Sequence, residues 1–306
     1  MTGFRLTDPI YLQTMAIVLS IIFLSGLIVF LLRQRNHYFV SAWASIKSWL
    51  VAAPLLFLVF GLPDPGPLVV LTLLAIYGAK IYFQILGMFH RSAFVLICYA
   101  GILGLGLASY HDSLNAYNNM PMVVLGISCL VPLLLNSYKR MIQYISLTLL
   151  GFIFLGWSFM HLGLIMNLPN GIYQILYLIV LTEFCDNTNL AVHRYFGWGK
   201  MFSEIDPKRT LSSTAISITL TLFLAGAMRQ LLPNTSDKYW LAAGLIASLG
   251  GMVGDLVMDV VRRDANVKII GPFILGRGDF LHRMDRLIFV APLYYYVMLA
   301  IGKLTT

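Results

Sequence analysis

The chain has 306 residues, of which 59% are hydrophobic and only 11% charged, and its mean hydropathy is +0.81. These are too few charged side chains to cover the surface of a soluble protein of this size. Long apolar stretches recur along the chain, and they are continuous rather than alternating, which excludes a transmembrane β-barrel. The sequence therefore predicts an all-α, polytopic integral membrane protein. The net charge of +8 favours an anionic membrane surface or a phosphate-bearing substrate over nucleic acid.

About ten transmembrane helices are expected along the chain, because a helix needs roughly 20 apolar residues to cross a hydrocarbon layer. They are predicted at residues 11–32, 48–62, 66–84, 92–109, 120–137, 141–166, 169–185, 211–228, 239–261 and 287–303. We predict two regions. Residues 1–185 contain about seven of the helices, and residues 186–306 contain the rest together with the functional site.

The distribution of basic residues predicts the orientation in the membrane. Of the 21 Lys and Arg residues, all except Arg5, Arg229, Lys238 and Lys303 fall in or beside the loops after the first, third, fifth, seventh and ninth helices. Short loops rich in Lys and Arg stay on the cytoplasmic side. Both termini are therefore expected on the non-cytoplasmic side of an inner or plasma membrane, and the functional site is expected to face the cytoplasm.

Two of the cytoplasmic loops, residues 186–210 and 262–286, are long and contain nearly half of the acidic residues. Long loops in a compact protein are usually functional or disordered, and the interleaved apolar residues argue against disorder. In the first loop, Asp206 is expected to cap a helix and Pro207 to begin it. Lys208 and Arg209 would then lie at a helix N-terminus, which is a favourable place for a phosphate.

Two carboxylates lie near the cytoplasmic end of the ninth predicted helix. Asp255 and Asp259 are four residues apart, so a helix places both on one face. Such a pair within an apolar span is tolerated when a cation or basic partners neutralise it. A divalent metal is the preferred interpretation, and Mg²⁺ fits better than Zn²⁺ because oxygen ligands dominate and no Cys/His cluster appears. The alternative is a structural salt bridge to Arg262 or Arg263.

The loop that follows these carboxylates is rich in groups that bind phosphate. Glycines at 271, 276 and 278 allow backbone amides to approach an anion closely. The basic residues of this region are Arg262, Arg263, Lys268, Arg277, Arg283 and Arg286. The alternative is that these charges only set the orientation in the membrane. Orientation, however, requires none of the acidic residues that are interspersed with them.

The most distinctive motif is residues 254–287, which read GDLVMDVVRRDANVKIIGPFILGRGDFLHRMDRL. This stretch aligns without a gap with GDLxxSxxKRxxxxKDxGxxxPGHGGxxDRxD, the signature of the CDP-diacylglycerol synthases, also called phosphatidate cytidylyltransferases, and it resembles that family. Upstream, IDPKRT at residues 205–210 is similar to the family's SPxKT segment, and Asp186 with Arg194, Phe196 and Gly197 resembles its D…GRxFG segment. The resemblance covers roughly the last 120 residues, and the preceding part matches only in being membrane helices.

The resemblance, together with the residues singled out above, implies a set of site residues. The expected catalytic residues are Asp255, Asp285, Lys268 and Arg283. The expected CTP-binding residues are Asp186, Lys208, Arg209, Arg262, Arg263, Gly276, Arg277 and Gly278. The expected ligands of Mg²⁺ are Asp255, Asp259, Asp279 and Asp285.

The chain departs from the family signature at several positions. Asp259 replaces a serine, Leu275 a proline, Arg277 a histidine and Asp279 a glycine. The two acidic positions that the family uses near its metal are occupied by Ile269 and His282. Because Asp259 and Asp279 are additional carboxylates close by in sequence, we hypothesise that the metal ligands have moved rather than disappeared.

The function that these patterns favour is transfer of CMP from CTP to a lipid phosphate within the membrane. With phosphatidate as the acceptor, the products are CDP-diacylglycerol and pyrophosphate. One alternative is a divergent paralogue that uses another lipid phosphate or another nucleotide. The other is a non-catalytic membrane protein of the same fold that binds lipids. The expected partners are CTP, a lipid phosphate and membrane lipids, with a homodimer as an open alternative and no nucleic acid.

Overall fold

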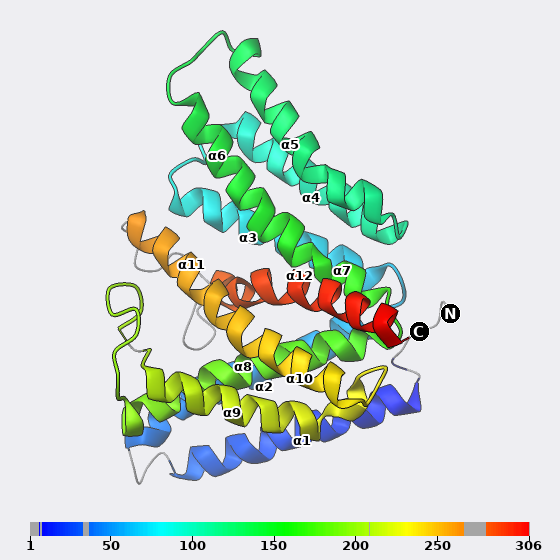
Figure 1. Ribbon diagram of the computed structural model, residues 1–306, viewed down its shortest axis with the longest axis vertical. Helices are drawn as coiled ribbons and strands as arrows, with labels where there is room; N and C mark the ends of the chain where they lie inside the picture. The colour runs from blue at the N-terminus through cyan, green and yellow to red at the C-terminus, as the bar shows by residue number, and fades with distance from the viewer. Residues whose placement is uncertain (1–5, 7, 33–36, 208, 266–279, 306) are drawn as a thin grey trace. The chain divides into compact units, whose positions relative to one another are not determined.

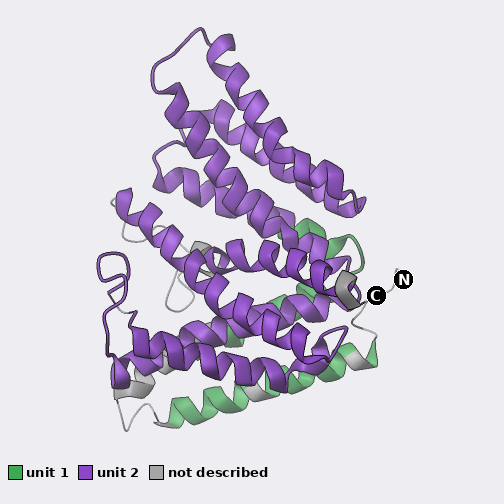
Figure 2. Cartoon of the chain, in the orientation of Figure 1, with its two compact units in different colours: residues 1–71, 271–280 green, residues 72–270, 281–306 purple. Residues whose placement is uncertain are grey.

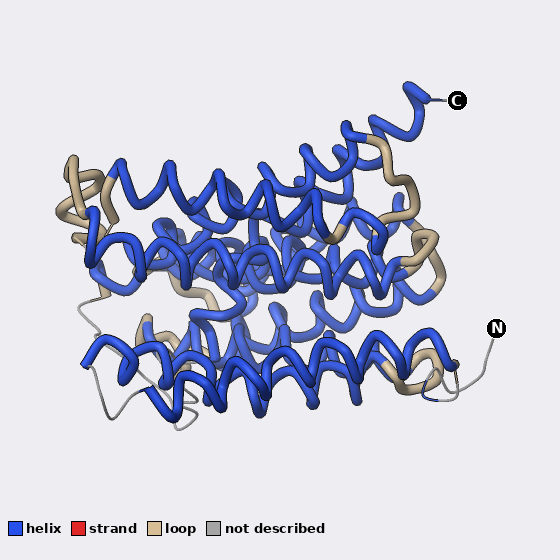
Figure 3. Tube along the Cα trace, turned by 90° about the horizontal axis from the view of Figure 1, so that it is seen from below, coloured by secondary structure: helices blue, strands red, loops and turns tan. Residues whose placement is uncertain are grey.

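The structure is a computed structural model that describes the chain except residues 1–5, 7, 33–36, 208, 266–279 and 306. The side chains of residues 10, 21, 32, 37–42, 44, 45, 48, 280–283 and 303–305 are also outside the description. The described residues form helices joined by loops (Figure 3), and an antiparallel bridge between Lys200 and Thr210 is the extended pairing found among them. The prediction of an all-α fold is confirmed.

The helices follow one another along the chain (Figure 1). Their bounds are α1 Pro9–Leu32, α2 His37–Phe60, α3 Gly66–Ile85, α4 Ser92–Tyr110, α5 Leu114–Leu134, α6 Met141–Gly151, α7 Phe159–Met166, α8 Gly171–Phe196, α9 Leu211–Ala227, α10 Asp237–Leu245, α11 Gly251–Asp264 and α12 Phe280–Thr305. Two π-helical segments, Phe152–Ser158 and Ile246–Gly250, join α6 to α7 and α10 to α11. Each of these pairs is therefore one long helix with a wider turn in its middle.

Within the described residues, eight helices are long and apolar enough to cross a membrane, judged by length and composition. Two shorter apolar helices, Trp49–Phe60 and Leu211–Ala227, coincide with the two remaining predicted spans. The chain is therefore a polytopic integral membrane protein, and the expected number of about ten spans is approximate.

Two predicted loops are shorter than expected because the helices beside them continue into charged sequence. α8 runs on to Phe196, so Asp186 lies inside a helix rather than at its end. α11 continues to Asp264, and α12 begins at Phe280, so Asp285 also lies in a helix. Hydropathy ends a predicted span at the first charges. Here the charges are paired with side chains of other helices, and the helices continue through them.

The predicted cap of α9 is wrong. The N-cap is Thr210, whose side chain accepts a hydrogen bond from the Ser213 backbone N–H, while the Ser213 hydroxyl accepts one from the Thr210 N–H. This reciprocal capping box satisfies two amide groups that the helix leaves unpaired. Asp206 instead binds the side chain of Arg209, at 3.2 Å. Pro207 and Arg209 are thus part of the loop, and Arg209 directly precedes the cap.

The chain divides into two compact units (Figure 2). One comprises residues 1–71 and 271–280, and the other residues 72–270 and 281–306. In the first unit, α1 and α2 form an antiparallel hairpin, in which the Tyr11 hydroxyl donates to the Phe57 carbonyl at 2.6 Å. Gly26 of α1 lies against Ile46 and Leu50 of α2. The predicted division at residue 185 stays a prediction.

In the second unit, α4–α7 pack as one group and α8–α11 as another, and α7 also contacts α8. α12 lies beside both groups (Figure 1). Its Tyr294 hydroxyl donates to Gln174 Oε1 of α8 at 2.7 Å, and its Tyr296 hydroxyl donates to Asn118 Oδ1 of α5 at 2.9 Å. Nearer the start of α12, Arg286 binds Asp186 of α8 and Asp255 of α11, so this part of the helix lies where the charged residues gather.

Candidate functional site

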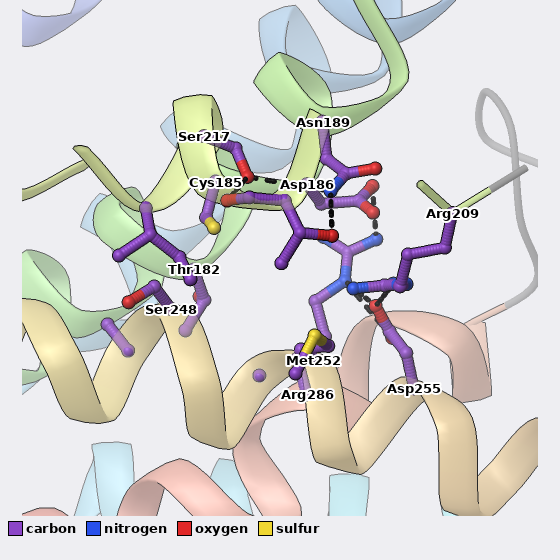
Figure 4. A pocket seen from close by; sticks show the side chains of 14 residues that line it. Thr182, Cys185, Asp186, Asn189, Arg209, Ser217, Ser248, Met252, Asp255 and Arg286 are labelled. Carbon is purple, nitrogen blue, oxygen red and sulfur yellow. Dashed lines mark hydrogen bonds and ion pairs between the residues drawn. The ribbon is translucent and has the colours of Figure 1, made fainter. Parts of the chain in front are cut away.

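A buried guanidinium group joins three helices in the second unit. Arg286 of α12 is only 4% exposed. Its Nη2 lies 2.8 Å from Asp186 Oδ2, and its Nη1 lies 3.0 Å from Glu183 Oε1, both on α8. Its Nε lies 3.3 Å from both carboxylate oxygens of Asp255 on α11. Each of the three guanidinium nitrogens thus lies near a carboxylate, and Figure 4 shows those of Asp186 and Asp255.

A second arginine reaches the same carboxylate from the loop before α9. Arg209 is 8% exposed, and its Nη2 lies 3.4 Å from Asp255 Oδ2. Its Nε binds Asp206 at 3.2 Å, which fixes the side chain at its base. Asp255, itself 4% exposed, therefore lies between two guanidinium groups. We call Glu183, Asp186, Asp255, Arg209 and Arg286 the arginine–carboxylate cluster.

Local sequence explains why these groups meet. Glu183 and Asp186 are three residues apart on α8, so both face the same direction. Gly254 allows α11 and α12 to approach, because a Cβ at this position would lie 2.1 Å from the backbone oxygen of Asp285. One turn earlier, Gly251 faces Thr182 of α8 and the Cβ of Arg286 at ordinary contact distances. Small residues on α11 thus place its neighbours within reach of Asp255.

A second charged group lies one helical turn further along α11. Arg262 Nη1 binds Asp259 Oδ1 at 3.2 Å, and Arg262 Nη2 binds Asp285 Oδ2. Asp285 is fully buried, whereas the Asp259 side chain is 31% exposed. We call these three residues the Arg262 cluster. The structural alternative weighed for Asp259, a salt bridge to Arg262, is therefore present.

The arginine–carboxylate cluster forms one end of a cavity between α8, α9 and α11 (Figure 4). Its lining residues are Thr182, Cys185, Asp186, Asn189, Arg209, Thr214, Ser217, Ile218, Ala247, Ser248, Gly251, Met252, Asp255 and Arg286. At the other end the polar side chains are neutral. Thr182, Ser217 and Ser248 donate their hydroxyl hydrogens to backbone carbonyls of their own helices, at 2.9, 2.9 and 2.7 Å. This end therefore offers oxygen lone pairs, and the other end offers charged groups.

Comparison with known proteins shows the family of the chain. Residues 43–301 match the cytidylyltransferase family, and this range includes every residue of the cavity. The chain belongs to the cytidylyltransferase family. Among its relatives is the phosphatidate cytidylyltransferase of Bacillus subtilis, 32% identical over 149 residues that cover 48% of this chain and 55% of the relative.

Two other relatives show the same partial overlap. The uncharacterized protein YnbB of Escherichia coli K12 is 31% identical over 130 residues, 42% of this chain and 44% of the relative. The phosphatidate cytidylyltransferase of Synechocystis is 29% identical over 145 residues, 45% of this chain and 47% of the relative. The aligned part thus spans about half the length of the curated relatives.

The structure brings some of the predicted site residues of this family member together. Asp186, Arg209 and Asp255 line the cavity. Asp259, Arg262 and Asp285 form the Arg262 cluster beside it, while Arg263 is exposed on α11. Arg283 lies in α12, but its side chain is not described. Lys208, Lys268, Gly276, Arg277, Gly278 and Asp279 lie outside the described residues.

Two members of the cluster had been given no specific role from the sequence. Arg286 counted only as one of several basic residues, and Glu183 was not among the expected site residues. The sequence contains one signal that could have paired Arg286 with Glu183. Two acidic residues three apart inside an apolar helix require a buried cation, and Arg286 is the basic residue that directly precedes the apolar run of the last helix. Nothing in the sequence showed which helix would supply that cation.

The donor set suits a divalent cation that prefers oxygen. Among the described residues, no group of three or more His, Cys, Asp or Glu side chains is arranged to hold a metal ion. Mg²⁺, however, usually takes one or two protein carboxylates and completes its coordination with phosphates and water. Asp186 and Asp255 meet at the same guanidinium group. They fit the protein's share of such a site.

Proposed function

We propose that this protein is a membrane-embedded cytidylyltransferase that transfers CMP from CTP to phosphatidate, giving CDP-diacylglycerol and pyrophosphate. The observation that carries the proposal is the arginine–carboxylate cluster at the end of a polar cavity, inside a helical membrane protein of the cytidylyltransferase family. Relatives at about 30% identity are named phosphatidate cytidylyltransferases. Buried charges within membrane helices are costly, and they usually mark a functional site.

In this reaction a phosphate oxygen of phosphatidate attacks the α-phosphorus of CTP. A new P–O bond forms, the bond from the α-phosphorus to the bridging oxygen of the β-phosphate breaks, and pyrophosphate leaves with the bonding electron pair. No protein nucleophile is required, so the protein contributes positioning and charge neutralisation. Arg209 and Arg286 line the charged end of the cavity and would bind phosphate oxygens there.

We propose Mg²⁺ as the cofactor, because a triphosphate carries more negative charge than two arginines balance. When bound, Mg²⁺ supplies charge neutralisation on the triphosphate. Of the predicted ligands Asp255, Asp259, Asp279 and Asp285, Asp255 is the one that lines the cavity among the described residues. Asp186 faces the same guanidinium and would complete the carboxylate pair. The Arg262 cluster would hold Asp285 in place at the side of the cavity.

We further propose that the cavity opens toward the cytoplasm of an inner or plasma membrane, with both termini on the other side. The distribution of basic residues in the loops supports this orientation. A cytoplasmic opening would give CTP access from solution, while the lipid phosphate would enter from the membrane leaflet. Within the chain, we place the catalytic function in residues 186–306, completed by Glu183 of the same helix as Asp186.

The experiment that tests the proposal is a transfer assay with the purified protein in lipid nanodiscs. CTP labelled at the α-phosphate is added with phosphatidate and Mg²⁺, and both labelled lipid and pyrophosphate are measured. We expect equal amounts of the two products. Asp255→Asn should reduce the rate at least 100-fold, because it removes the charge between Arg209 and Arg286.

Asp237→Asn is the matched control, because Asp237 is 76% exposed and pairs only distantly with Arg229, at 3.9 Å. Its rate should equal that of the unmodified protein. Labelled lipid formed only with another nucleotide or another lipid phosphate would replace the proposed substrates with those of a paralogue. Binding of phosphatidate without release of pyrophosphate would contradict an enzymatic function and favour a lipid-binding protein.

A further inference from the structure

Arg286 differs from the other basic residues of the site in being bound to carboxylates on every side of its fork. Its three nitrogen atoms contact Glu183, Asp186 and Asp255 at 2.8–3.3 Å. It is 4% exposed, and it comes from a third helix, α12. The guanidinium therefore lies between the two carboxylates, Asp186 and Asp255, that fit a divalent cation.

Arg286 also acts on a dication through its charge. It places one positive charge beside Glu183, Asp186 and Asp255, and this charge repels a dication that approaches the same oxygen atoms. Without Arg286 the attraction of these carboxylates for a dication is stronger in surroundings of low dielectric constant. Removing the arginine also frees the oxygen atoms that it occupies.

We propose that Arg286 is a positioning residue that competes with a divalent cation for Asp186 and Asp255. This proposal rests on the proposed function. Arg286 has two successive partners in it, first carboxylates and then phosphate. Its N–H groups hold the carboxylates of α8 and α11 together, and they would be available to phosphate oxygens when those carboxylates hold a cation. A guanidinium serves both partners because its planar fork matches carboxylate and phosphate alike.

The test measures metal binding without nucleotide, using Mn²⁺ in place of Mg²⁺ and electron paramagnetic resonance to count free Mn²⁺. We expect Arg286→Gln to bind Mn²⁺ at least tenfold more tightly than the unmodified protein. A merely structural role predicts the opposite, because damage to the cluster weakens binding. Equal or weaker binding by a variant that is monodisperse in detergent contradicts the proposal.

Three further variants sharpen this measurement. Arg286→Lys keeps a cation but cannot reach three carboxylates at once. Its Mn²⁺ affinity should therefore lie between that of the unmodified protein and that of Arg286→Gln. If Arg286→Gln does not fold, this variant decides, and an affinity equal to that of the unmodified protein overturns the proposal. Asp186→Asn should weaken binding, because it removes one of the two ligands. Arg229→Gln, at an exposed pair, should leave the affinity unchanged.

The outcome is separate from that of the transfer assay. Tighter Mn²⁺ binding by Arg286→Gln supports the competition even if CTP is not the substrate. Unchanged Mn²⁺ binding contradicts the competition even if CMP transfer is demonstrated. The two proposals can therefore fail independently.

Discussion

Two regions of the second unit contain buried polar groups, and these groups are paired in different ways. The arginine–carboxylate cluster pairs full charges from α8, α11, α12 and the loop before α9. The other region, the aromatic cluster, surrounds His161 with the rings of Tyr117, Trp157, Tyr295 and Tyr296, whose centroids lie 4.5–5.8 Å from that of the imidazole. His161 Nδ1 lies 2.8 Å from the Trp157 carbonyl one turn earlier, and the Tyr117 hydroxyl donates to the same oxygen at 2.5 Å.

The difference is one of charge. In the aromatic cluster, neutral groups bond to a backbone carbonyl, which accepts from His161 of the same helix and from Tyr117 of α5. In the arginine–carboxylate cluster, full charges from different helices pair with one another, and Asp186 and Arg286 are 100 residues apart. Removing one charge leaves its partner uncompensated in apolar surroundings, whereas removing one neutral hydrogen bond does not. The following variants measure this contrast.

The largest effect is expected at Asp285, which is fully buried and paired with Arg262. Asp285→Asn should lower the free energy of unfolding by about 3–5 kcal/mol, because it leaves a buried guanidinium short of negative charge. The midpoint of unfolding in a denaturant titration, followed by tryptophan fluorescence, measures the change. Asp259→Asn is the matched control, since Asp259 pairs with the same arginine but is 31% exposed. It should cost less than about 1 kcal/mol, and equal losses for the two variants would contradict the contrast.

A smaller loss is expected at Gly254, which allows the close approach of α11 and α12. Gly254→Ala places a Cβ 2.1 Å from the backbone oxygen of Asp285, and a backbone atom cannot rotate away as a side chain can. We expect a loss of about 1–3 kcal/mol and a lower rate of CMP transfer, because the carboxylate and arginine of the two helices move apart. In the control Gly126→Ala, the added Cβ meets no atom within 4 Å. This control should keep full activity and unfold no earlier than the unmodified protein.

The smallest effect is expected in the aromatic cluster. Tyr117→Phe removes one donor, but the Trp157 carbonyl still accepts from His161. The free energy of unfolding should fall by only about 0.6 kcal/mol, the average for a hydrogen bond between membrane helices. Mn²⁺ affinity and CMP transfer should be unchanged. A loss above about 2 kcal/mol would show that the two regions are not as different as their charges suggest.

Hydropathy was enough to place the spans, because crossing a hydrocarbon layer demands a long apolar helix. It failed at the ends of those helices. Asp186 and Asp285 were assigned to loops, since a single sequence does not show that a charge will find a partner on another helix. The cap of α9 was misplaced because Asp206 followed by proline is a common start signal, whereas the capping box of Thr210 and Ser213 lies just beyond.

The site was predictable to the extent that it is local in sequence. Asp255 and Arg209 stood out through motifs, and both line the cavity. The role of Arg286 was not visible, because its partners Glu183 and Asp186 lie on a helix about 100 positions earlier. The neutral end of the cavity was missed for another reason. Thr182, Ser217 and Ser248 are ordinary small residues of apolar helices until the fold places them around one space.

The length of α8 sets the depth of the arginine–carboxylate cluster in the membrane. From Gly171 to Asp186 this helix rises about 22 Å, and the rise to Phe196 adds about 15 Å more. A hydrocarbon layer is about 30 Å thick. Asp186 thus lies about 8 Å beneath the headgroups when the start of α8 is at the opposite boundary. A lipid phosphate would have to move only a short distance below the headgroup layer to reach the carboxylates. A water-soluble nucleotide would have to enter the protein to the same depth to meet that phosphate.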